Sequence, residues 1–71
     1  MHLTAIIEHT KEGWFVGQLE EIPEVLSQGR TKEELMENLR DAMEQLFLAN
    51  KQQTAAEHAG RDVTRADLKV A

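Results

Sequence analysis

The sequence predicts a small α+β domain in the order β-β-β-α-β, with one long helix packed on one face of a small, mostly antiparallel sheet. Two patterns lead to this prediction. Apolar residues recur at helical spacing in only one long stretch, residues 31–50. Shorter stretches on either side of it alternate between apolar and polar residues, as half-buried strands do. The whole chain, residues 1–71, is expected to form a single domain.

The predicted helix has one apolar face and a clear start. Thr31 and Glu34 match a capping box, in which the Thr31 hydroxyl accepts from the N–H three residues on and Glu34 reaches back to the Thr31 N–H. After Asn50 the apolar pattern weakens, so the helix is expected to end between Asn50 and Ala59. The apolar face comprises Leu35, Leu39, Ala42, Leu46 and Ala49, widened by Met36, Met43 and Phe47.

The first two predicted strands form a hairpin. Residues 3–9 and 14–20 alternate in polarity, and the connection between them ends in Gly13, which suits a turn with positive φ. Gly17 lies inside the second strand. It indicates either close approach of the helix or another backbone, or a bulge.

Two further strands are predicted around the helix. Pro23 has no N–H to donate and ends the second strand, so the chain turns before residues 25–28, the third strand. Gly29 permits the change of direction into the helix. After Gly60, residues 63–70 alternate again and predict a fourth strand.

Charge and size limit the classes of function. Eight basic against thirteen acidic residues give a formal charge of −5, which repels phosphate backbones and attracts basic partners, so direct nucleic-acid binding is not expected. There is no run of roughly 18 apolar residues and no leader-like start, so no membrane contact and a cytoplasmic location are expected. A small domain without cysteine gains burial by association, which predicts a homo-oligomer.

No catalytic or cofactor site is predicted. A metal-dependent nuclease needs converging carboxylates, whereas Glu8 lies on the first strand and the helix acids belong to the solvent face. The three histidines, His2, His9 and His58, share no metal-ligand spacing. Ser27 has no recognisable base partner. The chain is therefore expected not to be an enzyme, to bind no metal and to need no cofactor.

A resemblance to a known family adds a function. Gly13 before an apolar strand, the acidic Pro-containing turn at residues 20–24, and residues 27–31 (SQGRT) followed by Glu33 and Glu34 at the start of a helix resemble the HicB-like antitoxin family over residues 3–47. The resemblance implies a partial ribonuclease-H-like fold, a dimer or tetramer, and neutralisation of HicA, a small basic toxin that cleaves messenger RNA.

The chain departs from the family pattern at three points. Glu24 and Val25 replace a usual Gly-Cys or similar pair, and Leu35 replaces a usual alanine. The residues after Asn50 are too few to form the C-terminal DNA-binding module of many members beside a fourth strand. DNA binding by this chain alone is therefore not expected.

Two candidate surfaces follow from the sequence. The acidic residues Glu20, Glu21 and Glu24, together with the helix acids Glu37 and Asp41, are candidates for steering a basic partner, or else form an ordinary solvated surface. Trp14 and Ile6 lie on the strand faces opposite the helix and are candidates for an oligomer interface, homodimeric in the simplest case. The alternative to an antitoxin is a homo-oligomeric structural or small-molecule-binding domain without a toxin partner.

Overall fold

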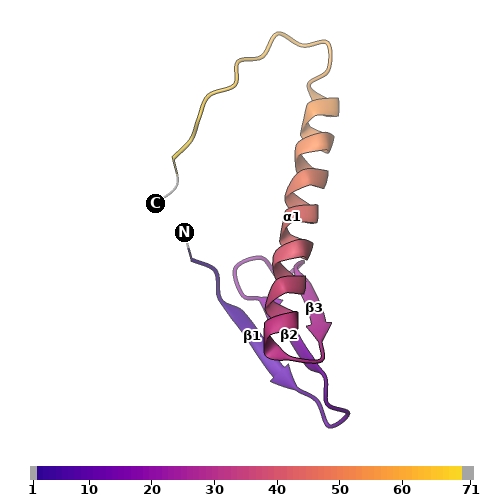
Figure 1. Ribbon diagram of the computed structural model, residues 1–71. Coiled ribbons are helices and arrows are strands. Elements are labelled where there is room, and N and C mark those ends of the chain that lie inside the picture. Colours follow the sequence, from indigo (N-terminus) through magenta and orange to yellow (C-terminus); the bar gives the residue numbers. More distant parts are fainter. Residues whose placement is uncertain (1, 70–71) are drawn as a thin grey trace.

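A computed structural model describes residues 2–69 and contains three strands followed by one long helix (Figure 1). The strands form one antiparallel sheet in the order β1-β2-β3, and the helix packs on one face of it. The α+β class is therefore confirmed, with each strand boundary within two residues of its prediction. The elements are β1 (Ala5–His9), β2 (Phe15–Leu19), β3 (Leu26–Gly29) and α1 (Lys32–Glu57).

The β1–β2 hairpin closes through a glycine turn, as predicted. Gly13 has a φ of 89°, and its N–H donates to the Thr10 carbonyl at 3.1 Å. The Thr10 N–H in turn donates to the Trp14 carbonyl at 2.8 Å, which continues the ladder by one step beyond the strands. A residue with a side chain would be strained at this φ, so glycine fixes where the hairpin turns.

Gly17 lies under the helix. A Cβ built at Gly17 would stand 3.0 Å from a terminal methyl group of Leu35 and 3.3 Å from one of Leu39. The pairing of β1 with β2 runs through Ile7 opposite Gly17 without interruption, so there is no bulge. Close approach of the helix is therefore the reason for this glycine.

A small core lies between the sheet and the first half of α1. Its four buried side chains are Leu19, Val25, Leu35 and Leu39. Partly buried apolar residues surround them: Leu3, Ala5, Ile7, Phe15, Ile22, Ala42, Met43 and Leu46. With only four buried side chains among residues 2–69, each one carries a large share of the stability of the domain.

The helix begins as predicted, with one difference in the cap. Thr31 is the N-cap, and its hydroxyl accepts from the Glu34 N–H at 3.0 Å. The Glu34 carboxylate, however, accepts from the N–H of Arg30 at 3.3 Å instead of that of Thr31. The prediction of a reciprocal capping box was wrong in this second bond, which reaches one residue further back.

The second half of α1 extends beyond the sheet. A 26-residue helix is about 39 Å long, whereas a five-residue strand spans about 17 Å. Phe47 is consequently 45% exposed, and Met36 and Ala49 are also exposed. The prediction that these three residues belong to a buried face was wrong, because the sheet ends below Leu46 and flanks α1 only on one side.

The prediction of a fourth strand was wrong for residues 63–69, which form no strand. Val70, the last residue of that prediction, lies outside the described residues. The helix continues to Glu57, and the chain then turns at Gly60, where φ is 78°. The tail therefore starts far from the sheet (yellow in Figure 1). Its alternating pattern has no neighbouring strand to pair with, so Leu68 is 87% exposed.

Across residues 2–69, no helix combines the length and the apolar character that crossing a lipid bilayer requires.

Candidate partner-binding surfaces

The acidic loop between β2 and β3 is held tightly by its own hydrogen bonds. The Val25 N–H donates to the Ile22 carbonyl at 2.9 Å, and the Leu19 N–H donates to the Val25 carbonyl at the same distance. The Gln18 side-chain amide donates to the Pro23 carbonyl at 2.7 Å. Since Val25 is also buried in the core, the loop presents its carboxylates from a fixed backbone.

The three acids of this loop, Glu20, Glu21 and Glu24, are exposed, but they are not equivalent. The Glu21 carboxylate accepts from the Thr4 N–H at 2.7 Å. The Glu20 N–H donates to the Thr4 carbonyl at 2.8 Å. These bonds tie the loop to the segment before β1. The Glu21 carboxylate is thus engaged in a hydrogen bond within the domain, while the carboxylates of Glu20 and Glu24 are the ones available to a partner.

The bond from the Thr4 N–H lowers the pKa of Glu21 below its usual value of 4.5, because it stabilises the ionised carboxylate. Glu21 therefore contributes stability above the pKa of the unfolded state, and this contribution is lost as the pH falls through the lower pKa of the folded state. Replacing Glu21 with glutamine keeps an acceptor but removes the charge. Between about pH 5 and pH 2, we expect the melting temperature of the Glu21→Gln protein to fall by less than that of the wild type.

The matched control is Glu24→Gln, which removes a carboxylate from the same loop but no bond to Thr4. Thermal unfolding followed by circular dichroism at a series of pH values makes the comparison. Parallel pH dependence of Glu21→Gln and the wild type would contradict a structural role for the Glu21 charge.

The helix acids Glu37 and Asp41 lie on a different layer of the molecule. Each helical residue advances about 100° around the axis, so both point about 160° away from Leu39, which faces the sheet. Both are exposed. The loop acids belong to the sheet layer, whereas these belong to the outer side of α1. The five predicted acidic residues therefore form two acidic areas.

Trp14 forms a contact that the sequence analysis missed. The Arg30 guanidinium lies 4.0 Å from the centre of the Trp14 ring, at a distance typical of a cation–π interaction. The register that pairs Phe15 with Gly29 brings the residues just outside those strands together. This register could have revealed the pair, since Trp14 precedes β2 and Arg30 follows β3. Trp14 is half-buried as a result.

The face of the sheet opposite α1 is open. Ile6 and Leu26 are 50% and 63% exposed on this face, which also presents amide and carboxylate side chains. Strand pairing arranges the face as two rows, Ile6–Gln18–Leu26 and Glu8–Val16–Gln28. Trp14 follows the same alternation as Val16. Both predicted interface residues therefore lie on the uncovered side of the sheet, with the Trp14–Arg30 pair at one end.

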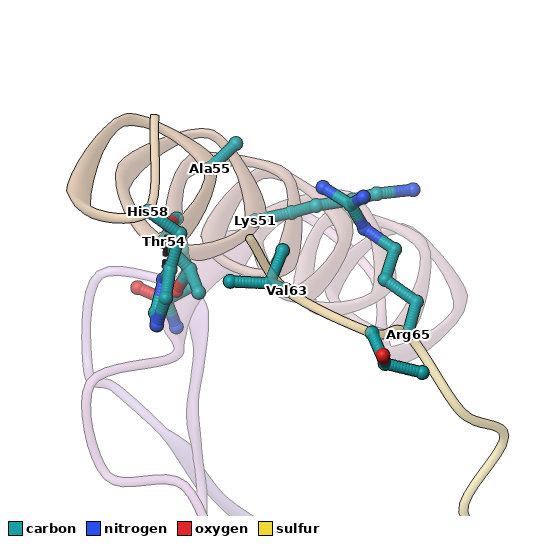
Figure 2. Close-up of a pocket in the computed structure, with 8 residues that line it drawn as sticks. Lys51, Thr54, Ala55, His58, Val63 and Arg65 are labelled. Atoms are coloured by element: carbon teal, nitrogen blue, oxygen red, sulfur yellow. Dashed lines mark hydrogen bonds between the residues drawn. The ribbon is translucent and has the colours of Figure 1, made fainter. Parts of the chain in front are cut away.

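A shallow hollow lies between the end of α1 and the tail (Figure 2). His58 is held there by its own helix, since its ring Nδ1 is 2.9 Å from the Thr54 carbonyl oxygen. Lys51 and Arg65 extend to the same side of α1. After the helix end, the Arg61 N–H donates to the His58 carbonyl at 3.1 Å.

The described part of the chain, residues 2–69, contains no group of three His, Cys, Asp or Glu side chains placed to hold a metal ion. Two histidines have structural contacts instead. His9 stacks on Phe15 with ring centres 4.2 Å apart, and His58 caps the last turn of α1.

Comparison of the chain with protein-family models, with curated proteins and with solved structures gives no match. The family resemblance therefore depends on the residues between positions 3 and 47. The structure gives two of them a physical reason, since Thr31 caps α1 and Gly29 is buried against its first turn.

Proposed function

We propose that this domain is a non-catalytic protein-binding module of the HicB-like antitoxin type, which neutralises a HicA-type ribonuclease by covering the surface of the toxin that binds messenger RNA. The supporting observation is the distribution of charge. Residues 1–47 include ten acidic and four basic residues, and all ten acids are exposed. A toxin that binds RNA must present cations to phosphates. An exposed acidic surface competes for the same cations.

The finer expectations belong to the same proposal. The β-β-β-α order agrees with the start of a partial ribonuclease-H-like fold, and association into a dimer or tetramer belongs to the same proposal. The site of action would be the cytoplasm, where messenger RNA is translated. The loop acids Glu20 and Glu24 and the helix acids Glu37 and Asp41 would contact the basic partner, with Glu21 holding the loop in place.

Coexpression with the protein encoded by the adjacent reading frame tests the proposal. If that protein is basic and of domain size, we expect the two chains to copurify as one complex that elevated salt weakens. A tagged copy of this chain that brings down no basic neighbour, at low or moderate salt, would contradict the proposal.

The loop charges should control how fast such a complex forms. Reversing the two free acids in a Glu20→Lys, Glu24→Lys protein is expected to lower the association rate with the toxin at least about tenfold at low salt, because the steering field changes sign near the contact. Stopped-flow fluorescence measures this rate. Glu21 is left unchanged so that the loop stays tied to Thr4.

The matched control is a Glu57→Lys, Asp62→Lys protein, which makes the same change in net charge at the far end of the molecule. A rate that falls equally in both proteins would mean that only net charge matters. An unchanged rate in the loop variant would exclude steering by this loop.

A second candidate is a homo-oligomer that acts without a toxin. The half-exposed Ile6 and Leu26 on the open face favour it, because apolar side chains on a sheet surface gain stability when a second copy covers them. Since both candidates are oligomers, the absence of a basic protein encoded next to this chain in the genome would distinguish it from the antitoxin.

A further inference from the structure

An apolar groove follows the outer edge of the sheet, between β1 and α1. It has a volume of about 150 Å³ and is lined by six apolar side chains together with Arg40; the apolar ones are Leu3, Ala5, Leu19, Met36, Leu39 and Met43. An apolar space of this size accommodates a hydrocarbon of about the size of benzene. One branched aliphatic side chain would therefore fit in it.

The strand beside this groove has a free edge. β1 is the first strand of the order β1-β2-β3, and among residues 2–69 it pairs with β2 alone. Its other side presents unpaired N–H and C=O groups along Ala5–His9. Such an edge pairs readily with an extended segment, and a neighbouring apolar groove then selects the side chain.

The tail of this chain has the pattern that such a site selects. Residues 63–69 form no strand or helix, and Leu68 is the most exposed large apolar residue in the part of the chain that the structure describes. In an extended segment, Leu68 and Ala66 share one side, while Arg65 and Asp67 share the other. The tail therefore combines an apolar side that fits a groove with a charged side that fits solvent.

We propose that the tail of one copy docks along β1 of a second copy, antiparallel to it, with Leu68 in the groove beside Ala5. Antiparallel pairing at this register sets Ala66 against Ile7 on the side facing α1. It also sets Arg65 beside Glu8 on the open side of the sheet, which pairs opposite charges across the strands.

The tail of the same copy cannot make this pairing. Met43 lies level with the groove, and the 14 residues from there to Glu57 raise the chain by about 21 Å. The turn after Glu57 takes up residues 58–61, and returning that distance in extended form takes about six further residues. Arg65 of the same copy has therefore not yet come back to the level of the groove. Glu8 lies further along in the same direction, past the groove and near the other end of β1. Contact between Arg65 and Glu8 therefore requires a second chain.

Charge also favours exchange between two copies. Residues 1–47 are strongly acidic, whereas residues 48–71 contain four basic and three acidic residues. Two copies repel each other when their first parts meet. Placing the last part of one copy against the first part of the other reduces this repulsion.

The same arrangement accounts for the exposed flank of α1. Met36, Met43 and Phe47 follow one another on the side of the helix toward the groove, within about 40° of rotation of each other. In a symmetric pair with antiparallel helices, this flank lies next to the same flank of the partner. The overhanging half of α1 then gains the packing that stabilises helices in water.

Cysteine cross-linking tests the proposal cleanly, because the chain has no cysteine of its own. A tagged Arg65→Cys protein mixed with an untagged Glu8→Cys protein in a glutathione buffer should form a mixed disulfide, since cross-strand neighbours come within bonding distance. The control pairs Arg61→Cys with Glu8→Cys. A mixed disulfide no more abundant than in the control would overturn the proposal.

An internal disulfide would assign the tail to its own copy. A monomeric Glu8→Cys, Lys69→Cys protein that closes an internal disulfide would mean that the tail lies along its own β1 and would overturn the proposal.

The Leu68→Asp substitution should raise the dissociation constant of the dimer at least about tenfold, as measured by sedimentation, whereas Leu26→Asp on the open face should leave it unchanged. The reverse order of these effects would place the dimer contact on the open face and overturn the proposal.

Discussion

The Leu35→Ala protein is expected to be largely unfolded at room temperature. Leu35 is 0% exposed, and its methyl groups fill the space above Gly17. Truncating a fully buried leucine to alanine costs about 2–5 kcal/mol. A single core in a domain of this size rarely supplies more than about 3–5 kcal/mol. Urea unfolding followed by far-ultraviolet circular dichroism measures the difference.

The control for this prediction is Leu26→Ala, which makes the same chemical change at a side chain that is 63% exposed. Surface substitutions of this kind change stability by no more than about 0.5 kcal/mol. Equal destabilisation by the two substitutions would mean that α1 is not packed on the sheet through Leu35.

The Gly29→Ala protein is expected to be the other strongly destabilised variant. A Cβ at Gly29 would stand 2.6 Å from the Leu35 backbone nitrogen and 3.1 Å from the Glu34 carbonyl carbon. These are main-chain atoms of the first turn of α1, so they cannot move without lifting the helix from β3. Overpacking of this kind costs about 1–3 kcal/mol or more.

Gly17→Ala provides the comparison, because the nearest atoms there are the flexible ends of the Leu35 and Leu39 side chains, at 3.0 and 3.3 Å. Rotation of those methyl groups relieves part of the clash. We therefore expect the free energy of unfolding to fall more in Gly29→Ala than in Gly17→Ala. A larger loss at Gly17 would contradict the close approach at the start of the helix.

The three strands and the helix start could be predicted because local signals determine them. Gly13 sets the hairpin turn, Pro23 ends the second strand, and Thr31 caps α1. Each of these acts through its own backbone conformation or through bonds to residues within a few positions. The polarity pattern then assigns the buried face of each strand.

The course of the chain after Leu46 could not be predicted in the same way. Helix-forming residues continue to Glu57, so the helix extends beyond the sheet, and Phe47 is left 45% exposed. The alternation in residues 63–69 is a true strand pattern. Pairing, however, depends on an available neighbouring edge, which no local pattern encodes.

The candidate site was predicted in part. Exposure of the loop and helix acids follows from their polarity, but the bond from the Thr4 N–H that engages Glu21 joins residues 17 positions apart. The Trp14–Arg30 contact likewise depends on the strand register. Composition therefore indicated an acidic surface, and only the tertiary structure separated the free carboxylates from the one used by the fold.

The most direct test of the proposed function is to measure RNA cleavage by the basic protein of the adjacent reading frame while this chain is added in increasing amounts. We expect cleavage to stop near stoichiometric addition, and the Glu20→Lys, Glu24→Lys protein to inhibit cleavage more slowly than the wild type at the same concentration. Cleavage that continues unchanged at a large excess of the wild-type chain would contradict the account.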